Sequence, residues 1–451
     1  MGTLDKMENF VHNVEPYFSR IDNPVPTRIM KYITPTLCFC FVLLSAGFAA
    51  EPSWPVFHGP KGDNMSTDTG LLTSWPEEGP KLLWKIDTLG VGPAGYASVA
   101  VDEGKIFTSG NLEENGDTYS TVVCLNAKDG KTLWTYQNGP AWTDARMYPG
   151  TRSTPTIDGD YVYDESPYGQ VVCLDKKTGD MIWTKNILSG FEAMNITWAL
   201  AESVIIDGDN VICTPGGEKA CVVALNKKTG DTVWATPGIG QLTSYTTPYV
   251  FEFEGIRIVA VMNQKGGLCV DAKTGKMLFQ FTHETKYDIN ATIPYYFDGQ
   301  LFITSGYGTG SQLLKLSKDG DGVKYEQVWE NKKFDNQHGG VVPLDGYVYG
   351  TTMGYKGGIW ACLRLSDGEL VWEDRGVGKG SCTYADGMVY GMSEKDGSVS
   401  LFKATPEKYE EVGRFRLPEE GEGMYWAHPV VCGKRLYLRH AQFLYCYDVA
   451  K

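Results

Sequence analysis

From about residue 80 onward, short runs of alternating apolar and polar residues are separated by glycine turns. The segment 171–183, VVCLDKKTGDMIW, is one example: two such runs flank a Lys-Thr-Gly turn. Alternation with a period of two predicts β-strands, and a glycine with positive φ between two of them predicts a hairpin. Related phrases end at Trp134, Trp183, Trp234, Phe279 and Trp372, each with a small residue ten positions earlier and a glycine four positions earlier.

The aromatic residue that ends each phrase is predicted to pack between neighbouring units, because a large ring anchors such a contact well. We assign this docking role to Trp84, Trp134, Trp183, Trp234, Phe279, Trp329 and Trp372.

A second repeated signal is a glycine turn, usually after an acidic residue, that leads into a short apolar-aromatic strand. Its glycines are Gly104, Gly159, Gly208, Gly255, Gly299, Gly346, Gly387 and Gly433. They lie about 47 residues apart on average, which is the length of a four-stranded propeller blade. The two signals together predict an all-β protein, an eight-bladed β-propeller of four-stranded antiparallel blades.

The last unit lacks its docking strand. Cys446 and Asp448 match Cys173 and Asp175, but the chain stops before a tryptophan follows. An unassigned strand with the right pattern, Lys81–Ile86, carries Trp84 at the other end of the chain. We expect this N-terminal strand to complete the last blade, because pairing the two ends removes a free sheet edge.

An apolar run at residues 33–50 ends in small residues and is typical of a signal peptide, with cleavage near Ala49 or Ala50. A single membrane anchor is the alternative interpretation. Met30 would give a signal peptide of ordinary length and is an alternative start. We divide the chain into an N-terminal extension with signal peptide (1–50), a lead-in (51–80) and one propeller domain (81–451), and expect it in the periplasm or outside the cell.

Charge and mean hydropathy disfavour two classes of interaction, with nucleic acid and with the membrane interior. The net charge of −14 disfavours nucleic acid, which carries the same sign, and mean hydropathy of −0.25 leaves no integral membrane domain after signal cleavage. We expect a monomer. Five of the cysteines, at the small position of the repeats, are expected to be buried thiols, whereas Cys213 and Cys221 could form a disulfide.

The repeated phrases resemble the pyrroloquinoline quinone (PQQ)-like repeats of the quinoprotein alcohol dehydrogenase-like propellers. The resemblance covers roughly residues 54–451, and the opening WPVFHGP and the closing LYLR with YCYD are similar to a bacterial secreted subgroup. The resemblance implies eight blades and either a quinone or no cofactor. The outer-membrane-assembly propeller lipoprotein is also similar, but its lipid-attachment cysteine has no counterpart here. The adjacent cysteines that mark many of the dehydrogenases are absent as well.

The segments between blades should bring polar and aromatic residues to the mouth of the central channel. The predicted ligand-binding residues are Arg152, Trp198, Tyr245, Asn290, His338, Lys379 and Trp426. A planar quinone could stack on Trp198 or Trp426, with Arg152 or Lys379 on its carboxylates. For the calcium ion that accompanies such a quinone, the candidates are Glu202, Asp288 and Asn290. The alternative is that these side chains only cap strand ends and fill the mouth of the channel.

Two functions fit this sequence. The favoured hypothesis is an exported, non-catalytic binding or scaffold module that takes a protein, a glycan or a small ligand at the mouth. The alternative is a PQQ- and calcium-dependent dehydrogenase that oxidises an alcohol or sugar. No catalytic residue is assigned, because the motifs of zinc proteases, serine hydrolases and phosphate-binding loops are missing.

Overall fold

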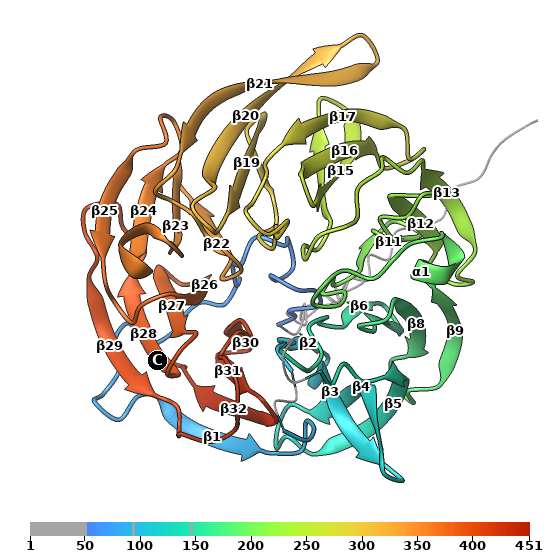
Figure 1. Ribbon diagram of the computed structural model, residues 1–451. Helices are drawn as coiled ribbons and strands as arrows, with labels where there is room; N and C mark the ends of the chain where they lie inside the picture. The colour runs from blue at the N-terminus through green and yellow to red at the C-terminus, as the bar shows by residue number, and fades with distance from the viewer. Residues whose placement is uncertain (1–51, 93–94, 145–147) are drawn as a thin grey trace, which may run out of the picture. The chain divides into compact units, whose positions relative to one another are not determined.

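The computed structural model describes residues 52–92, 95–144 and 148–451. These residues form eight four-stranded antiparallel sheets arranged as blades around a ring (Figure 1). In blades 1 to 7 the four strands follow each other in sequence order, from the centre of the ring to its rim. The predicted eight-bladed β-propeller is confirmed.

Blades 1 to 4 consist of β2 (Ala100–Asp102), β3 (Lys105–Glu114), β4 (Asp117–Asn126) and β5 (Thr132–Pro140); β6 (Thr156–Asp158), β7 (Tyr161–Glu165), β8 (Gln170–Asp175) and β9 (Met181–Asn186); β10 (Ile205–Asp207), β11 (Asn210–Cys213), β12 (Val222–Asn226) and β13 (Thr232–Thr236); and β14 (Tyr249–Phe253), β15 (Ile256–Asn263), β16 (Gly266–Asp271) and β17 (Met277–Thr282). A short helix, α1 (Ile187–Gly190), lies between β9 and β10.

Blades 5 to 8 consist of β18 (Tyr295–Phe297), β19 (Gln300–Ser305), β20 (Gly310–Asp319) and β21 (Gly322–Asn331); β22 (Val341–Leu344), β23 (Tyr347–Thr351), β24 (Trp360–Arg364) and β25 (Leu370–Asp374); β26 (Gly380–Ala385), β27 (Met388–Ser393), β28 (Ser398–Lys403) and β29 (Glu411–Arg416); and β30 (Val430–Cys432), β31 (Arg435–His440), β32 (Phe443–Asp448) and β1 (Lys81–Ile86). A 3₁₀ turn, η2 (Tyr355–Gly357), follows β23.

The repeated glycine turns join the first and second strands of every blade. All eight glycines have positive φ, from 57° at Gly159 to 84° at Gly255. In blade 1 the preceding residue, Glu103, also has positive φ (44°). The residue before the glycine also has positive φ in blades 4 to 7, but not in blades 2, 3 and 8. Two successive positive φ angles are typical of the turn whose twist matches a tight hairpin, and five of the eight blades have them.

Docking tryptophans link six of the eight blades to the next, and Phe279 stands at the same position in blade 4. Trp183 stands opposite Cys173 across the β8–β9 hairpin, so a small residue leaves room for the indole. Its Nε1 donates a hydrogen bond of 2.9 Å to the Lys227 carbonyl in the next blade. A Cβ on Gly230 of that blade would lie 2.7 Å from the ring, so the turn glycine allows the close approach. The equivalent indole bonds run from Trp84 to Ala127, Trp134 to Lys176, Trp234 to Ala272, Trp329 to Leu365 and Trp372 to Thr405.

Blade 7 has no aromatic residue at the docking position. Gly413 of β29 stands there, opposite Leu401. Trp75, from the lead-in, covers Gly413 with its Cβ, backbone nitrogen and Cγ, and its indole packs edge-on against Phe415 with ring centroids 5.3 Å apart. Trp75 is buried in the core shared by blades 7 and 8. The lead-in therefore supplies the tryptophan that this blade lacks.

The N-terminal strand closes the ring, as predicted. β1 pairs antiparallel with β32, and Trp84 lies opposite Cys446. Blade 8 therefore combines β1 with the three C-terminal strands, and β1 supplies the fourth strand that this blade needs.

The remaining sequence predictions concern the N-terminal segment, membrane-spanning helices and the cysteines. The signal segment and its cleavage site lie outside the described residues and stay predictions, as does the division at residue 50. No helix of the described part is long and apolar enough to cross a membrane. The nine cysteines that the structure describes are buried free thiols, so Cys213 and Cys221 form no disulfide here.

Candidate functional site

One end of the ring collects the segments in which the candidate residues lie. The inter-blade linkers enter each first strand at the end opposite its first hairpin turn, and the loops between second and third strands open at that same end. We call this end the mouth. His338, Lys379 and Trp426 come from three such linkers, and Glu394 directly follows β27.

Glu394 is the centre of the mouth. Its Oε2 accepts hydrogen bonds from Lys379 Nζ at 2.7 Å and Trp426 Nε1 at 2.9 Å, and lies 3.0 Å from His338 Nε2. The Lys379 ammonium also bonds the Gln337 side chain. The four side chains come from blades and linkers up to 88 residues apart in sequence, so the ring closure brings them together.

The charges at this centre are paired. Burial alone would raise the pKa of Glu394, but the His338 hydrogen bond and the Lys379 charge lower it to about 2. Burial, with Lys379 nearby, holds the pKa of His338 below its ordinary value. At neutral pH Glu394 and its bonded partners therefore comprise one carboxylate, one ammonium and a neutral imidazole that donates Nε2–H to Glu394.

Aromatic rings surround the same point. Trp426 lies between Tyr96 and Tyr148, with ring centroids 4.9 Å away in both cases, and 5.3 Å from His338. Arg152 lies over the Tyr96 ring at 5.5 Å and donates to the Tyr148 carbonyl. Four of the seven predicted ligand residues, Arg152, His338, Lys379 and Trp426, are thus neighbours within one cluster.

The other three predicted ligand residues lie further round the ring. Trp198 and Tyr245 contact each other, with ring centroids 6.0 Å apart. Asn290 is fully buried, and its amide donates to the Asn263 carbonyl at 2.7 Å and accepts from Ser305 Oγ at 2.6 Å. Its side chain holds blades 4 and 5 together, and its role in ligand binding stays a prediction.

The structure gives the three candidate metal ligands separate protein partners. Asp288 forms an ion pair with Lys265 at 2.7 Å, and Asn290 is held as described above. Glu202 accepts from the Thr214 backbone at 3.1 Å, and burial raises its pKa to about 8, so the carboxyl is protonated at neutral pH. Within the described ranges no group of three or more His, Cys, Asp or Glu is arranged to hold a metal ion.

Comparison with known proteins agrees with this architecture. The family described as outer membrane protein assembly factor BamB matches residues 44–251. This chain is a PQQ-like repeat β-propeller. A search of curated proteins finds no significant match to it.

Solved structures share the fold of this PQQ-like repeat propeller at low sequence identity. BamB from Moraxella catarrhalis is 15% identical, with a TM-score of 0.53 over 78% of this chain and 93% of that one. Quinohemoprotein alcohol dehydrogenase from Comamonas testosteroni is 12% identical, with a TM-score of 0.62 over 90% and 82%. The quinohemoprotein alcohol dehydrogenase ADHIIG from Pseudomonas putida HK5 is 12% identical, with a TM-score of 0.59 over 88% and 80%.

The candidate residues predicted above do not fit a calcium-bound quinone in this PQQ-like repeat propeller. Calcium needs several ionised or neutral oxygen ligands around one point, and Glu202, Asp288 and Asn290 do not provide them. Lys379, predicted to bind a quinone carboxylate, is already paired with Glu394 inside the mouth. No step is therefore assigned to a quinone.

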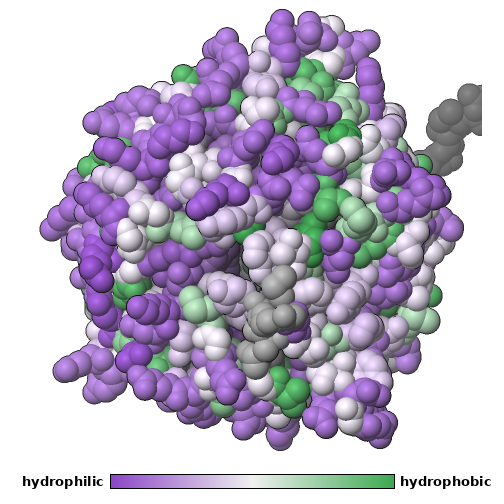
Figure 2. Space-filling model, viewed as in Figure 1, coloured by the Kyte–Doolittle hydropathy of each residue, from purple (hydrophilic) through white to green (hydrophobic). Residues whose placement is uncertain are grey.

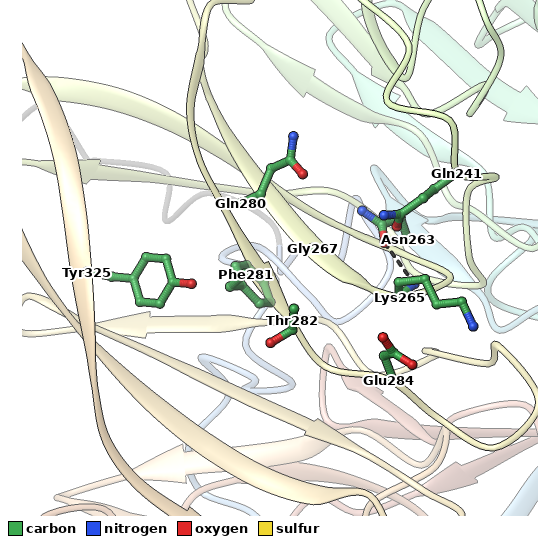
Figure 3. Close-up of a pocket in the computed structure, with 9 residues that line it drawn as sticks. All are labelled: Gln241, Asn263, Lys265, Gly267, Gln280, Phe281, Thr282, Glu284 and Tyr325. Atoms are coloured by element: carbon green, nitrogen blue, oxygen red, sulfur yellow. Dashed lines mark hydrogen bonds between the residues drawn. The ribbon is translucent and has the colours of Figure 1, made fainter.

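A separate cavity of about 280 Å³ lies beside blade 4, against β21 of blade 5 (Figure 3). Its lining is mostly polar, and Asn263 Oδ1 accepts from the Lys265 backbone at 2.9 Å within it. None of the predicted ligand residues lines this cavity, whose walls are Gln241, Asn263, Lys265, Gly267, Gln280, Phe281, Thr282, Glu284 and Tyr325.

Sequence reasoning missed Glu394, the residue on which the mouth depends. The predicted site residues all came from the inter-blade linkers, whereas Glu394 lies in the loop between β27 and β28. An antiparallel blade places that loop at the same end as the linkers. A charged residue directly after a fully buried second strand was the available signal.

Proposed function

We propose that this chain is an exported, non-catalytic binding module that takes a neutral glycan at the mouth. The observation that carries the proposal is the paired-charge centre at Glu394, surrounded by aromatic rings. A protein segment and a small molecule other than a sugar are the alternative ligands. The hexalysine peptide and PQQ represent them in the experiments below.

Charge pairing supports a neutral ligand. The Glu394 carboxylate and the Lys379 ammonium neutralise each other at 2.7 Å, with exposed side-chain fractions of 15% and 13%. A charged ligand would have to separate a half-buried ion pair, whereas hydroxyl groups could add hydrogen bonds to it without doing so.

Exposed tyrosines support a ligand with apolar faces. Among the described residues, the exposed large aromatic side chains are Tyr148, Tyr168 and Tyr287, all from linkers or loops that open at the mouth. Each contacts a second aromatic ring: Trp426 at 4.9 Å, Trp142 at 5.7 Å and Tyr307 at 5.2 Å. Sugar rings offer C–H faces for such rings and hydroxyls for the polar centre.

The surface argues against a broad protein interface on the face seen in Figure 2. That face is largely hydrophilic, with small separate hydrophobic areas. Large permanent protein interfaces are more apolar than this. The apolar run at residues 33–50 supports export, as does the match to a family described as an outer membrane protein assembly factor.

The test is a binding screen on the purified full chain. Soluble neutral hexasaccharides of glucose, xylose, mannose and N-acetylglucosamine are compared with hexagalacturonate and a hexalysine peptide by calorimetry and thermal melting. We expect at least one neutral sugar to bind and to stabilise the protein by about 2.7 kcal/mol at one hundred times its Kd.

A matched pair of variants locates the binding. Tyr148 and Leu133 are equally exposed (47% and 48%), but Leu133 lies on the outer strand β5. Tyr148→Ala should abolish binding, and Leu133→Ala should leave it unchanged. Binding of the charged probes alone, or equal binding by both variants, would contradict the proposal.

The same assay tests the dehydrogenase alternative. PQQ with calcium is added to the chain, and its absorbance and the melting temperature are followed. Tight binding with a shifted quinone spectrum would favour the dehydrogenase over the binding module.

A further inference from the structure

The lead-in reaches the centre of the ring from the end opposite the mouth. It meets two first hairpin turns: the Leu71 backbone amide donates to the Asp386 carboxylate at 2.9 Å, and the Asp68 carboxylate accepts from the Lys434 backbone amide at 2.6 Å. In Figure 1 the lead-in, drawn in blue, crosses the middle of the ring before it reaches β1. Its first part therefore lies beside the innermost strands, where Trp54 bridges to Val101, and its later part reaches the outer strand β29 with Trp75.

His58 is a lead-in residue whose side chain is buried among the blades. Its φ of 68° is unusual for a residue with a side chain, and its exposed fraction is 3%. A Cβ on Gly340 would lie 3.3 Å from the His58 ring and 3.2 Å from the His428 ring, so a glycine gives both rings room. A strained backbone held among buried partners indicates a constrained function.

A chain of three hydrogen bonds runs from Tyr295 on β18 through His58 of the lead-in to the mouth. The Tyr295 hydroxyl lies 3.1 Å from His58 Nδ1, and His58 Nε2 lies 3.1 Å from His428 Nδ1. His428 Nε2 lies 2.8 Å from the carbonyl oxygen of His338, whose ring bonds Glu394. The planes of the His58 and His428 rings are inclined by 22°, with centroids 4.8 Å apart.

Donor and acceptor chemistry fixes the direction of this chain. A carbonyl oxygen can only accept, so His428 carries its proton on Nε2. Its Nδ1 is then the acceptor, so His58 must donate from Nε2. His58 Nδ1 is left to accept from the Tyr295 hydroxyl. When both imidazoles are neutral, this is the one arrangement of protons that satisfies all three bonds.

The surroundings favour these neutral forms. Burial and the neighbouring His428 hold the pKa of His58 well below its ordinary value, and burial and His338 lower that of His428 to about 3. The groups that face the pair are the His338 ring, Tyr295 on β18, and Phe57 of the lead-in, while Asp63 and Cys382 lie next to Tyr295. Among the described residues neither ring of the pair has a carboxylate partner.

We propose that His58 and His428 are positioning residues that hold the His338 end of the mouth, and that acid releases this hold by protonating them. The proposal rests on the mouth being the binding site proposed above. A proton on either ring would place a positive charge in a buried site, where His58 and His428 are 3% and 7% exposed and have no carboxylate partner among the described residues, so the charged form favours the undocked, hydrated state. The lead-in would then undock, and the linker that carries His338 would loosen.

Hydrogen exchange of the ligand-free full chain tests the positioning role. His58→Leu removes both bonds at similar volume, and His283→Leu is the matched control, because His283 is also buried with a pKa lowered to about 4 but lies outside the chain of bonds. At pH 7.5 we expect His58→Leu to raise exchange at least tenfold in peptides covering residues 335–341, and His283→Leu to leave it unchanged. Peptides covering β9 report whether either variant unfolds globally.

Nitrogen NMR of the wild-type chain with labelled histidine supplies a test that needs no variant. Both His58 and His428 should be neutral with the proton on Nε2 at pH 7.5. A proton on Nδ1 of either ring would overturn the proposal, as would unchanged exchange in His58→Leu.

Acid gives the third measurement. Undocked imidazoles titrate near 6.5, so lowering the pH to 5.0 should favour the undocked state by about 30-fold for each ring. After correction for the intrinsic pH dependence of exchange, the 335–341 peptides should therefore exchange faster at pH 5.0 in the wild type. In His58→Gln, which has one titrating ring fewer, the rise should be smaller by about that factor. An equal rise in both proteins would overturn the acid release. Because no ligand is present, failure of sugar binding would count against the proposed function alone.

Discussion

The outer wall of this propeller and its mouth are built in opposite ways. At the wall, one contact is used again and again: an indole donates to a carbonyl of the next blade and packs on a turn glycine there. At the mouth, every contact occurs once, and Glu394 is bonded by a lysine, a tryptophan and a histidine from three different linkers. Repetition stabilises the ring, whereas the single-copy linkers are free to differ and to build a site.

The largest effect that would test this contrast is loss of ring closure. Deleting every residue before Asp87 removes β1 and leaves β32 with an unpaired edge. We expect the truncated chain to aggregate, because an exposed edge pairs with other molecules. Size-exclusion chromatography with light scattering measures this.

A second truncation separates closure from the lead-in. Deleting residues before Pro80 removes Trp75 and His58 but keeps β1, and this protein should stay monomeric with a lower melting temperature. A stable monomer without β1 would contradict the closure argument.

The next effect compares one tryptophan from each region. Trp183 is 7% exposed and packs between blades, so Trp183→Ala should lower the free energy of unfolding by about 3–5 kcal/mol. Trp426 is only half-buried and bonds a carboxylate, so Trp426→Ala should cost about 1–2 kcal/mol while removing ligand binding. Urea denaturation and calorimetry with the sugar from the screen measure both. If Trp426→Ala destabilised the protein as much as Trp183→Ala and left sugar binding intact, Trp426 would have only a packing role.

The smallest effect sharpens the view of the wall. Gly230 and Gly255 both have positive φ (74° and 84°), so a change to alanine strains the backbone equally. A Cβ on Gly230 would meet Trp183 at 2.7 Å, whereas a Cβ on Gly255 has nothing within 4 Å. Gly230→Ala should therefore lower the free energy of unfolding by about 1–3 kcal/mol more than Gly255→Ala in urea denaturation. Equal costs would show that the tryptophan does not need the glycine.

The sequence predicted the wall because its signals are local. A glycine four residues before an aromatic, and a small residue ten before it, fall within one hairpin, where register makes Cys173 face Trp183. The same reasoning identified Lys81–Ile86 as the strand that completes the last blade. Blade 5 lacks the repeated phrase because its β20–β21 hairpin is longer, although Trp329 still faces Leu313.

The mouth could be predicted only in part. The rule that linkers meet at one end selected His338, Lys379 and Trp426, which do share a partner, but that partner was missed and Asn290 was included although its amide is used between blades. Linker length and side-chain direction decide such contacts, and neither follows from a repeat.

By itself, then, the sequence of this protein determined the number of blades, the hairpin turns, the docking positions and the closing strand, since each depends on residues close together along the chain or on strict repetition. The tertiary structure alone decided that Trp75 fills the gap at Gly413, that Glu394 joins three linkers, and that His58 meets His428. His58 and His428 are 370 residues apart. Contacts over such distances form only after the ring has closed, because closure fixes where each linker and the lead-in lie.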